Sequence, residues 1–265
     1  MNTPASPAGS VLLNLAGKKG LIVGIANEHS IAWGCAQAMH AQGGALAITY
    51  LNDKALPWVQ PLAAQVQADI LAPLDVEQPG QLEEVFATIS QRWGRLDFVL
   101  HAIAYAPAAD LHGRVTDCSA AGFARAMDVS CHSFIRMARL AEPLMKDGGT
   151  LITMSYYGAQ KVIANYGIMG PVKAALEASV RYLAAELGPA GIRVHAVSPG
   201  PIKTRAASGI GQFEHLLDDA AQRAPEHLLV SPADVGGVAA LLCSDAARAM
   251  TGNVVFVDAG YHVIG

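Results

Sequence analysis

Short apolar runs alternate with longer amphipathic stretches along the whole of this 265-residue chain. The apolar runs are rich in Val, Ile, Leu and Ala, and they lie at 18–24, 45–50, 69–76, 96–104, 148–156, 191–200 and 253–260. Between them, apolar residues recur at helical spacing at 30–44, 54–67, 80–94, 119–146, 165–188 and 232–244, and the stretch before the last of these is irregular. In 80–94, for example, Leu82, Val85, Phe86 and Ile89 fall on one helical face. The pattern therefore predicts strands and helices in alternation.

Alternating strands and helices, with strands that are apolar throughout, are typical of a parallel sheet covered by helices. We expect an α/β fold: a single-domain, Rossmann-like doubly wound parallel sheet of about seven strands with helices on both faces. This domain spans residues 17–265. Residues 1–16 lack the basic and apolar segments of a signal peptide, so we expect a disordered or extended lead-in.

Composition narrows the classes of partner. The chain has 18 Lys and Arg against 22 Asp and Glu, with no basic cluster, which argues against nucleic acid. No apolar run reaches the length of about 18 residues that a membrane span needs. The four cysteines are scattered without a Cys-x-x-Cys pair, which favours free thiols in a reducing cytoplasm over disulfides or a metal site. Because 52% of the residues are hydrophobic, we also expect a subunit interface.

The turn after the first predicted strand has the composition of a dinucleotide-binding turn. Gly24 permits a tight turn, and Ala32 and Gly34 allow the start of the next helix to approach a ligand and the sheet. Ser30 is placed to cap that helix or to bind phosphate, beside the free N–H groups of the helix start. A tight turn without a ligand explains the same residues, but its position at the first crossover favours a bound dinucleotide.

The ends of the next strands also fall at the edge where such sheets bind ligands. Leu51 and Asp53 follow the second strand, where the adenosine ribose is held. No Arg is present there to bind a 2′-phosphate, and an inward-facing Asp53 would repel one, which favours NADH over NADPH. Asp53 is equally suited to capping the following helix. We interpret His101, at the end of the fourth strand, as a packed histidine and not as a catalyst.

Tyr156, Tyr166 and Lys173 are the candidate catalytic residues. A lysine and a tyrosine beside a nicotinamide form a chemical pair, because the phenol donates to a substrate oxygen while the cation stabilises the phenol or binds ribose hydroxyls. In a regular helix, about 10 Å of rise would separate Tyr166 from Lys173. We therefore expect Tyr166 at or before the helix start, leaning over the cleft. Two ordinary helix residues remain the alternative interpretation.

Nearly the whole chain resembles the NADH-dependent enoyl-acyl-carrier-protein reductases of bacteria, within the short-chain dehydrogenase/reductase superfamily. The first turn matches their G-x5-S-x-A-x-G pattern, and further matches are ITYLND and the run from SYYGAQKVIANYG to LAAELG. Tyr166 and Lys173 have the family's Tyr-x6-Lys spacing. Carbonyl reductases of the superfamily use Tyr-x3-Lys, but Met169 stands at that tyrosine position, and HAIA replaces their Asn-Asn-Ala-Gly. The resemblance therefore implies enoyl reduction.

The resemblance also implies a role for each candidate residue. Tyr166 would hydrogen-bond the thioester carbonyl and stabilise the enolate, Lys173 would hold the nicotinamide ribose, and Tyr156 would line the acyl pocket. The residues implied for the cofactor, NADH, are Gly24, Ser30, Ile31, Leu51, Asp75, Val76, Ile103, Lys173, Ile202, Thr204 and Ala206. Those implied for the substrate are Ala106, Tyr156, Tyr166, Met169 and Phe213, and no metal is expected.

The substrate implied is a trans-2-enoyl thioester on acyl carrier protein or coenzyme A, in fatty-acid elongation, and the implied assembly is a homotetramer built on helices 119–146 and 165–188. Segment 198–213 would cover the acyl pocket and become ordered when cofactor binds. The chain departs from the family at Leu51, usually Gln, at Ala104, usually Gly, and at 211–215, which lacks basic residues. A carrier protein would then need Lys203, Arg205 or Arg223 for charge attraction. A carbonyl or alcohol dehydrogenase and a non-catalytic dinucleotide sensor remain the alternatives.

Overall fold

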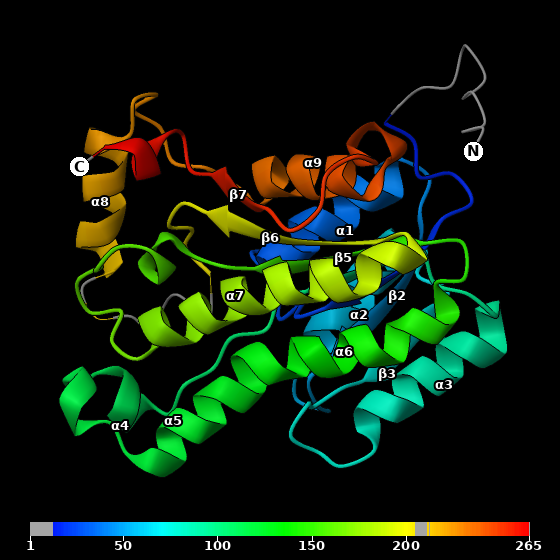
Figure 1. Ribbon diagram of the computed structural model, residues 1–265, viewed down its shortest axis with the longest axis horizontal. Helices are drawn as coiled ribbons and strands as arrows, with labels where there is room; N and C mark the ends of the chain where they lie inside the picture. Colours follow the sequence, from blue (N-terminus) through cyan, green and yellow to red (C-terminus); the bar gives the residue numbers. More distant parts are fainter. Residues whose placement is uncertain (1–12, 205–210, 212, 265) are drawn as a thin grey trace.

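The computed structural model describes residues 13–204, 211 and 213–264 (Figure 1). A seven-stranded sheet forms its centre, and every pair of neighbouring strands is parallel. The strands are β1 Lys19–Val23, β2 Ala45–Tyr50, β3 Ile70–Pro73, β4 Phe98–His101, β5 Gly149–Met154, β6 Ile192–Pro199 and β7 Val254–Val257. Their order is β3-β2-β1-β4-β5-β6-β7, which confirms the doubly wound parallel sheet predicted from the sequence.

Helices cover both faces of this sheet (Figure 1). One face carries α1 Ile31–Ala41, α2 Leu56–Gln65 and α9 Pro232–Cys243, and the other carries α3 Gln81–Trp93, α6 Ser133–Ala141 and α7 Met169–Leu187. Three further helices lie at the edge of the fold: α4 Ala108–Leu111, α5 Ala120–Met127 and α8 Phe213–Arg223. Successive residues of a strand serve opposite layers, because Leu21 and Val23 pack with α3 and α6 whereas Ile22 packs with α1 and α9.

Helices α1 and α9 touch at two glycines. A Cβ on Gly34 would lie 2.2 Å from the carbonyl oxygen of Pro232, and one on Gly236 would lie 2.4 Å from that of Gly34. We expected Gly34 to open space for a ligand and the sheet, and that expectation is wrong. The space that Gly34 leaves is filled by the start of α9, nearly two hundred residues away in the sequence.

Several element boundaries differ from the prediction, and three of the differences bear on the site. The single helix expected at 119–146 is divided by a π-helical turn, Asp128–His132, between α5 and α6. Strand β3 ends at Pro73, not at Val76. Helix α7 begins at Met169 and not near 165, because Asn165 and Gly167 have positive φ angles of 61° and 51°, which are incompatible with an α-helix.

The described start of the chain is tied to the fold, since Leu15 is fully buried and its N–H donates to the carbonyl of Gln42. All four cysteines are unpaired. Within residues 13–204, 211 and 213–264, no helix is long and apolar enough to cross a bilayer. The same residues contain no cluster of three or more His, Cys, Asp or Glu suited to a metal ion.

Candidate active site

The strand order creates a crevice at the carboxyl edge of the sheet. Strand β1 lies between β2 and β4, so the chain winds outward in one direction from β1 and in the other from β4. Ligands of doubly wound sheets bind at this switch point, outside the carboxyl ends of the strands. Here the two flanking residues are Gly24, after β1, and Ala102, after β4.

Gly24 is required by this geometry. Its φ is +111°, a conformation that residues with a side chain rarely adopt, and a Cβ there would lie 2.2 Å from the carbonyl oxygen of Ala102. The missing side chain therefore lets the two strand ends approach each other and leaves the crevice between them free of a methyl group.

Ser30, at the start of α1, organises the turn that follows Gly24. Its hydroxyl accepts hydrogen bonds from the N–H groups of Ala26 and Asn27, at 3.0 and 3.1 Å. It makes no hydrogen bond to the first turn of α1, so the capping role expected for Ser30 is wrong. Because no side chain caps α1, its first N–H groups are left for an anion at the helix N-terminus.

The other expected cofactor residues lie at the same edge of the sheet. Leu51, 55% exposed, follows β2; Asp75 and Val76 follow β3; Ile103 follows β4; and Ile202 and Thr204 follow β6. Ile31 begins α1. Ala206 lies outside the described residues, as do the other residues of 205–210 and residue 212 in the segment expected to cover the acyl pocket.

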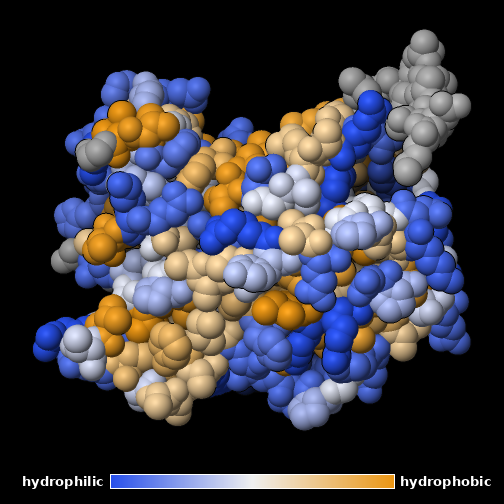
Figure 2. Space-filling view, in the orientation of Figure 1, coloured by the Kyte–Doolittle hydropathy of each residue, from blue (hydrophilic) through white to orange (hydrophobic). Residues whose placement is uncertain are grey.

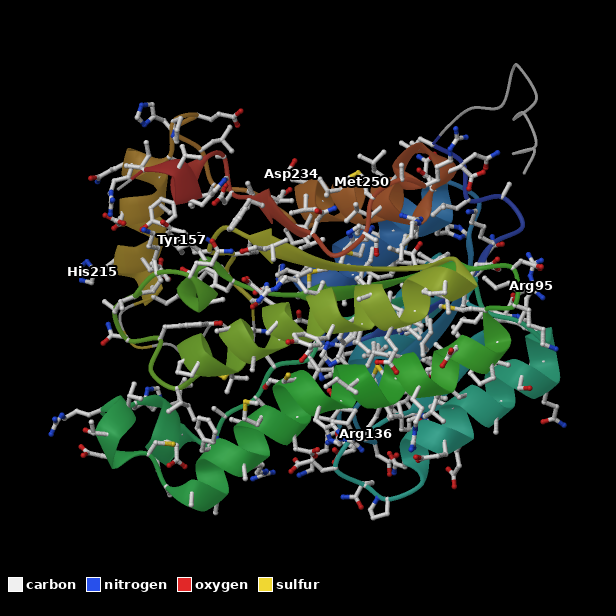
Figure 3. All side chains as sticks on the ribbon, in the orientation of Figure 1. Arg95, Arg136, Tyr157, His215, Asp234 and Met250 are labelled. Atoms are coloured by element: carbon white, nitrogen blue, oxygen red, sulfur yellow. The ribbon has the colours of Figure 1, made fainter. Side chains whose placement is uncertain are left out.

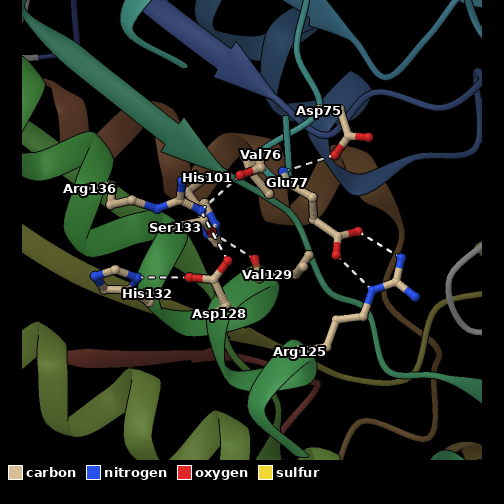
Figure 4. Close-up of polar contacts among 10 residues, drawn as sticks. All are labelled: Asp75, Val76, Glu77, His101, Arg125, Asp128, Val129, His132, Ser133 and Arg136. Carbon is tan, nitrogen blue, oxygen red and sulfur yellow. Dashed lines mark hydrogen bonds and ion pairs between the residues drawn. The ribbon is translucent and has the colours of Figure 1, made fainter. Parts of the chain in front are cut away.

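Two arginines hold the segment that follows β3 (Figure 4). Arg136 of α6 donates to the carbonyl of Val76 at 2.9 Å. Arg125 of α5 binds both carboxylate oxygens of Glu77, at 2.6 and 2.8 Å, which lowers the pKa of that carboxyl. These contacts leave the side chain of Asp75 at the rim of the crevice, where it accepts the N–H of Glu77.

Tyr156 and Tyr166 meet at the catalytic end of the crevice. Tyr166 precedes the first residue of α7 by three positions, which confirms that it lies before the helix start. The two rings lie edge to face with their centroids 4.8 Å apart. Gly158 makes room for this arrangement, because a Cβ there would lie 2.5 Å from the Tyr166 ring.

Both phenols are held in the protonated form. Burial raises the pKa of Tyr166 well above its usual value, and Tyr156 and Glu177 raise it further. Burial also raises the pKa of Tyr156. The Tyr156 hydroxyl is buried without a partner, and the Tyr166 hydroxyl makes no hydrogen bond to any described residue. Tyr166 is therefore free to donate a hydrogen bond to a ligand.

Lys173 lies within the first two turns of α7 and is 4% exposed. Its ammonium donates to the carbonyl of Met154, at the end of β5, over 2.6 Å. Burial lowers the pKa of Lys173 to about 8, although Cys131 and Glu177 oppose the shift. The lysine is thus charged at neutral pH and is positioned by the end of β5. No hydrogen bond joins it to Tyr166 among the described residues.

Glu177, one turn beyond Lys173, is a site residue that the sequence analysis missed. This buried carboxylate accepts the hydroxyl of Ser155 at 2.6 Å and the side-chain amide of Gln160 at 3.2 Å. Glu177 therefore connects α7 to Ser155 and Gln160, which precede and follow Tyr156 and Tyr157 in the sequence. The available signal in the sequence was an acidic residue on a helix between two apolar residues, Leu176 and Val180, which the structure shows to be buried.

His101 is completely buried, and both of its ring nitrogens are engaged; Figure 4 shows the contact with Ser133. Ser133 donates to the carbonyl of Val129 at 2.7 Å and so accepts from Nε2 of His101 at 2.8 Å. Nδ1 then accepts from Thr153 at 2.9 Å. Burial, helped by the nearby Lys173 charge, lowers the pKa of His101 to about 3. The ring is a neutral structural link.

Four of the five expected substrate residues come together in one apolar cluster. Tyr166 and Met169 are among its buried members, and Ala106 and Tyr156 pack against them. Phe213, the first residue of α8, is half-buried and lies outside this cluster. The structure therefore gathers the acyl-pocket residues that flank Tyr166 but leaves Phe213 apart.

A cavity of about 530 Å³ lies between segment 161–165 and α8. Ile163, Asn165 and Leu216 are among its lining residues, and Tyr157 forms its inner wall. Tyr157 packs edge to face on Phe256 and Tyr261, on the side of the molecule that carries α8 and His215 (Figure 3).

The basic residues expected near α8 are paired with acids of α8 itself. Lys203 binds Glu214 over 2.5 Å, and Arg223 binds Asp219 over 3.4 Å. Arg205 lies outside the described residues. Neither Lys203 nor Arg223 therefore presents an uncompensated positive charge.

A doubly wound sheet with a glycine-opened crevice, and with a buried tyrosine and lysine at the start of α7, defines a dinucleotide-dependent oxidoreductase of the short-chain dehydrogenase/reductase class. Residues 24–262 match the model of a family described as enoyl-(acyl carrier protein) reductase. The chain belongs to this family.

Relatives agree over nearly the full length. The enoyl-[acyl-carrier-protein] reductase [NADH] 2 of Rhizobium meliloti is 47% identical over 247 residues, which are 93% of this chain and 92% of the relative. The FabI protein of Nostoc, also named as an NADH enzyme, is 45% identical over 96% of this chain and its own full length. A crystal structure of the reductase of Anaplasma phagocytophilum with NAD superposes with a TM-score of 0.92, at 46% identity, covering 96% of this chain and 97% of that one. A Bacillus cereus reductase, crystallised with NADP+ and an indole naphthyridinone, has a TM-score of 0.92 and 41% identity, covering 95% of this chain and 98% of that one.

Proposed function

We propose that this protein reduces the carbon–carbon double bond of trans-2-enoyl thioesters with NADH, as a step of fatty-acid elongation. The observation that carries the proposal is the placement of Tyr166. A protonated phenol that makes no hydrogen bond to the described residues stands just before α7, seven residues ahead of a buried lysine. That spacing differs from the ketone-reducing pattern, in which Met169 would have to be the proton donor.

The crevice fits a dinucleotide. A Cβ at Gly24 would close it, and the start of α1 offers N–H groups that no side chain caps. We assign Gly24, Ser30, Ile31 and Lys173 to the pyrophosphate and nicotinamide side, with Ser30 acting through the turn that it holds. The further cofactor residues are Leu51, Asp75, Val76, Ile103, Ile202, Thr204 and Ala206. Leu51 offers no group to bind a 2′-phosphate, which favours NADH.

When bound, the nicotinamide would supply a hydride to the β-carbon of the enoyl group, and the enolate would then take up a proton from water at the α-carbon to give the saturated thioester. Tyr166 donates a hydrogen bond to the thioester carbonyl, and this bond strengthens as negative charge develops on the enolate oxygen. The raised pKa of Tyr166 keeps its proton in place for this role. Lys173 holds the ribose hydroxyls while it is charged, below a pH of about 8.

Apolar side chains around Tyr166 bind the acyl chain. Ala106, Tyr156 and Met169 pack in its cluster and exclude water from the reacting carbons. Phe213, at the start of α8, is also assigned to the substrate, although it lies outside this cluster.

The acyl carrier is acyl carrier protein or coenzyme A. Because Glu214 neutralises Lys203 and Asp219 neutralises Arg223, α8 gives an acidic carrier protein little charge attraction. We therefore expect kcat/KM for a carrier-bound substrate to depend only weakly on salt concentration. We also expect the coenzyme A thioester to compete with the carrier-bound thioester as a substrate.

We further propose a homotetramer in the cytoplasm, assembled on α5–α6 and α7. Tyr182 on α7 is 79% exposed and Phe123 on α5 is 43% exposed, and Figure 2 shows apolar residues gathered over the region of α4 and α5. The unpaired cysteines suit a reducing compartment. Light scattering coupled to size-exclusion chromatography gives the subunit number.

A spectrophotometric assay tests the activity. Crotonyl-coenzyme A, crotonyl carrier protein and an acetoacetyl thioester are each mixed with NADH or NADPH, and loss of the reduced nicotinamide is followed with mass detection of the product. We expect NADH to be consumed and the butyryl thioester to form. Reduction of the ketone alone would support a carbonyl reductase, and NADH binding without any turnover would support a dinucleotide sensor.

A further inference from the structure

The long helix that borders the crevice is interrupted at one place, the π-helical turn Asp128–His132. Such turns are rare and leave backbone groups of the helix out of register. Ser130, in the middle of the turn, is completely buried. The interruption therefore places a buried hydroxyl where a regular helix would not.

That hydroxyl holds a peptide segment on the other side of the crevice. Ser130 accepts the N–H of Tyr105 at 2.9 Å and donates to the carbonyl of the same residue, also at 2.9 Å. One side chain thus satisfies both backbone groups of Tyr105. The Tyr105 ring does not anchor the segment in the core, since it is 40% exposed and lies against the Arg125 guanidinium.

Tyr105 belongs to a segment, 102–107, that has no helix or strand of its own. Ile103 at one end of it lies on the cofactor side, and Ala106 at the other packs in the Tyr166 cluster. No neighbouring strand holds Tyr105. The distance between the cofactor side, at Ile103, and the substrate side, at Ala106, therefore depends on the hydroxyl of Ser130.

The same turn is also fixed to the strands that carry the catalytic residues. Ser133 bonds to Val129 within the turn and to His101 at the end of β4, and His101 continues to Thr153 on β5. Thr153 immediately precedes Met154, whose carbonyl holds Lys173. The turn therefore has one buried hydrogen-bonded path to the lysine and another to segment 102–107.

We propose that Ser130 is a positioning residue for enoyl reduction, which fixes segment 102–107 so that the enoyl thioester lies in register with the nicotinamide and Tyr166. The proposal rests on the proposed function. Errors of about 1 Å in the placement of a substrate lower rates by about 100-fold. Removing the hydroxyl should therefore lower turnover while leaving the cofactor in place, because Gly24, α1 and Lys173 hold NADH independently of Ser130.

The test compares Ser130→Ala with Ser179→Ala. Ser179 is a matched control because it lies on α7 beside the same turn, with its hydroxyl 3.6 Å from the Cys131 sulfur. Among the described residues, this hydroxyl bonds only to that sulfur and to the carbonyl of Ala175 in its own helix. We expect Ser130→Ala to lower kcat/KM for the enoyl thioester by about 10- to 100-fold. The Kd for NADH should stay within about threefold, and Ser179→Ala should match wild type. Equal losses in both variants, or wild-type kinetics in Ser130→Ala, would overturn the proposal.

A second measurement does not depend on activity or on the variant folding. Hydrogen exchange in wild type should show the Tyr105 amide protected and, where Ser130→Ala folds, exchanging at least tenfold faster, with β4 unchanged. An unprotected Tyr105 amide in wild type would refute the role of Ser130. Wild-type enzyme that turns over no enoyl thioester would refute the proposed function instead, and the exchange result would still decide whether Ser130 holds the segment.

Discussion

Replacing Lys173 by methionine removes a buried ammonium and keeps a flexible side chain of similar length. The fall of the Lys173 pKa from 10.5 to about 8 corresponds to roughly 3 kcal/mol of lost stability at neutral pH. The variant also loses the hydrogen bond that Lys173 donates to the Met154 carbonyl, which lowers its stability by about 1 kcal/mol. We therefore expect Lys173→Met, free of dinucleotide, to be about 2 kcal/mol more stable than wild type at pH 7.

The dependence on pH distinguishes this cause from a packing effect. Between pH 8 and 10.5 the unfolded protein still binds a proton at Lys173 that the folded protein has released, so wild-type stability rises with pH in this window. The variant has no such gain. Its advantage should therefore shrink by about 2–3 kcal/mol between pH 7 and pH 10.

Urea unfolding of both proteins at equal concentration and at both pH values measures this difference. Groups that do not interact with Lys173, such as the buried thiols of Cys35 and Cys243, cancel in the comparison. If the two stabilities ran parallel from pH 7 to pH 10, the burial cost assigned to Lys173 would be wrong. NADH binding provides the functional side of the experiment, and we expect it to weaken in the variant, because the ribose loses its cation.

Two further substitutions test the scaffold around the crevice. Gly24→Ala places a methyl group 2.2 Å from a carbonyl oxygen at a φ of +111°, so the Kd for NADH measured by fluorescence should rise at least tenfold; Gly237→Ala, with open space around it, is the control. Ser231→Ala removes the capping box that Ser231 forms with Asp234 at the start of α9, and should lower the free energy of unfolding by about 1 kcal/mol in urea without changing NADH binding.

The inner strands were accessible from the sequence because β1, β2, β4, β5 and β6 are buried on both faces. A run such as Leu21–Val23 contributes to two apolar layers at once, so it has to be apolar throughout. The place of Tyr166 before α7 also followed from the sequence, since only a residue outside the helix can overcome the rise toward Lys173. Local pattern and helix geometry were sufficient for these features.

What the sequence did not reveal depends on partners far apart in the chain. The small size of Gly34 is evident, but its neighbour Pro232 is not. The bond between Ser155 and Glu177 joins a strand end to a helix. The π-helical turn has no residue pattern of its own, so Ser130 looked like any other serine of an amphipathic helix.

The most direct test of the account is the turnover of Tyr166→Phe beside that of Tyr157→Phe. Both tyrosines are buried and near in sequence, but Tyr157 packs on Phe256 and Tyr261 and not on the acyl pocket. With NADH and a crotonyl thioester, Tyr166→Phe should lower kcat by about 100- to 1,000-fold with the Kd for NADH unchanged, as expected when a single oxyanion donor is removed. Tyr157→Phe should remain close to wild type. An unchanged kcat in Tyr166→Phe would contradict the central claim that this phenol stabilises the enolate.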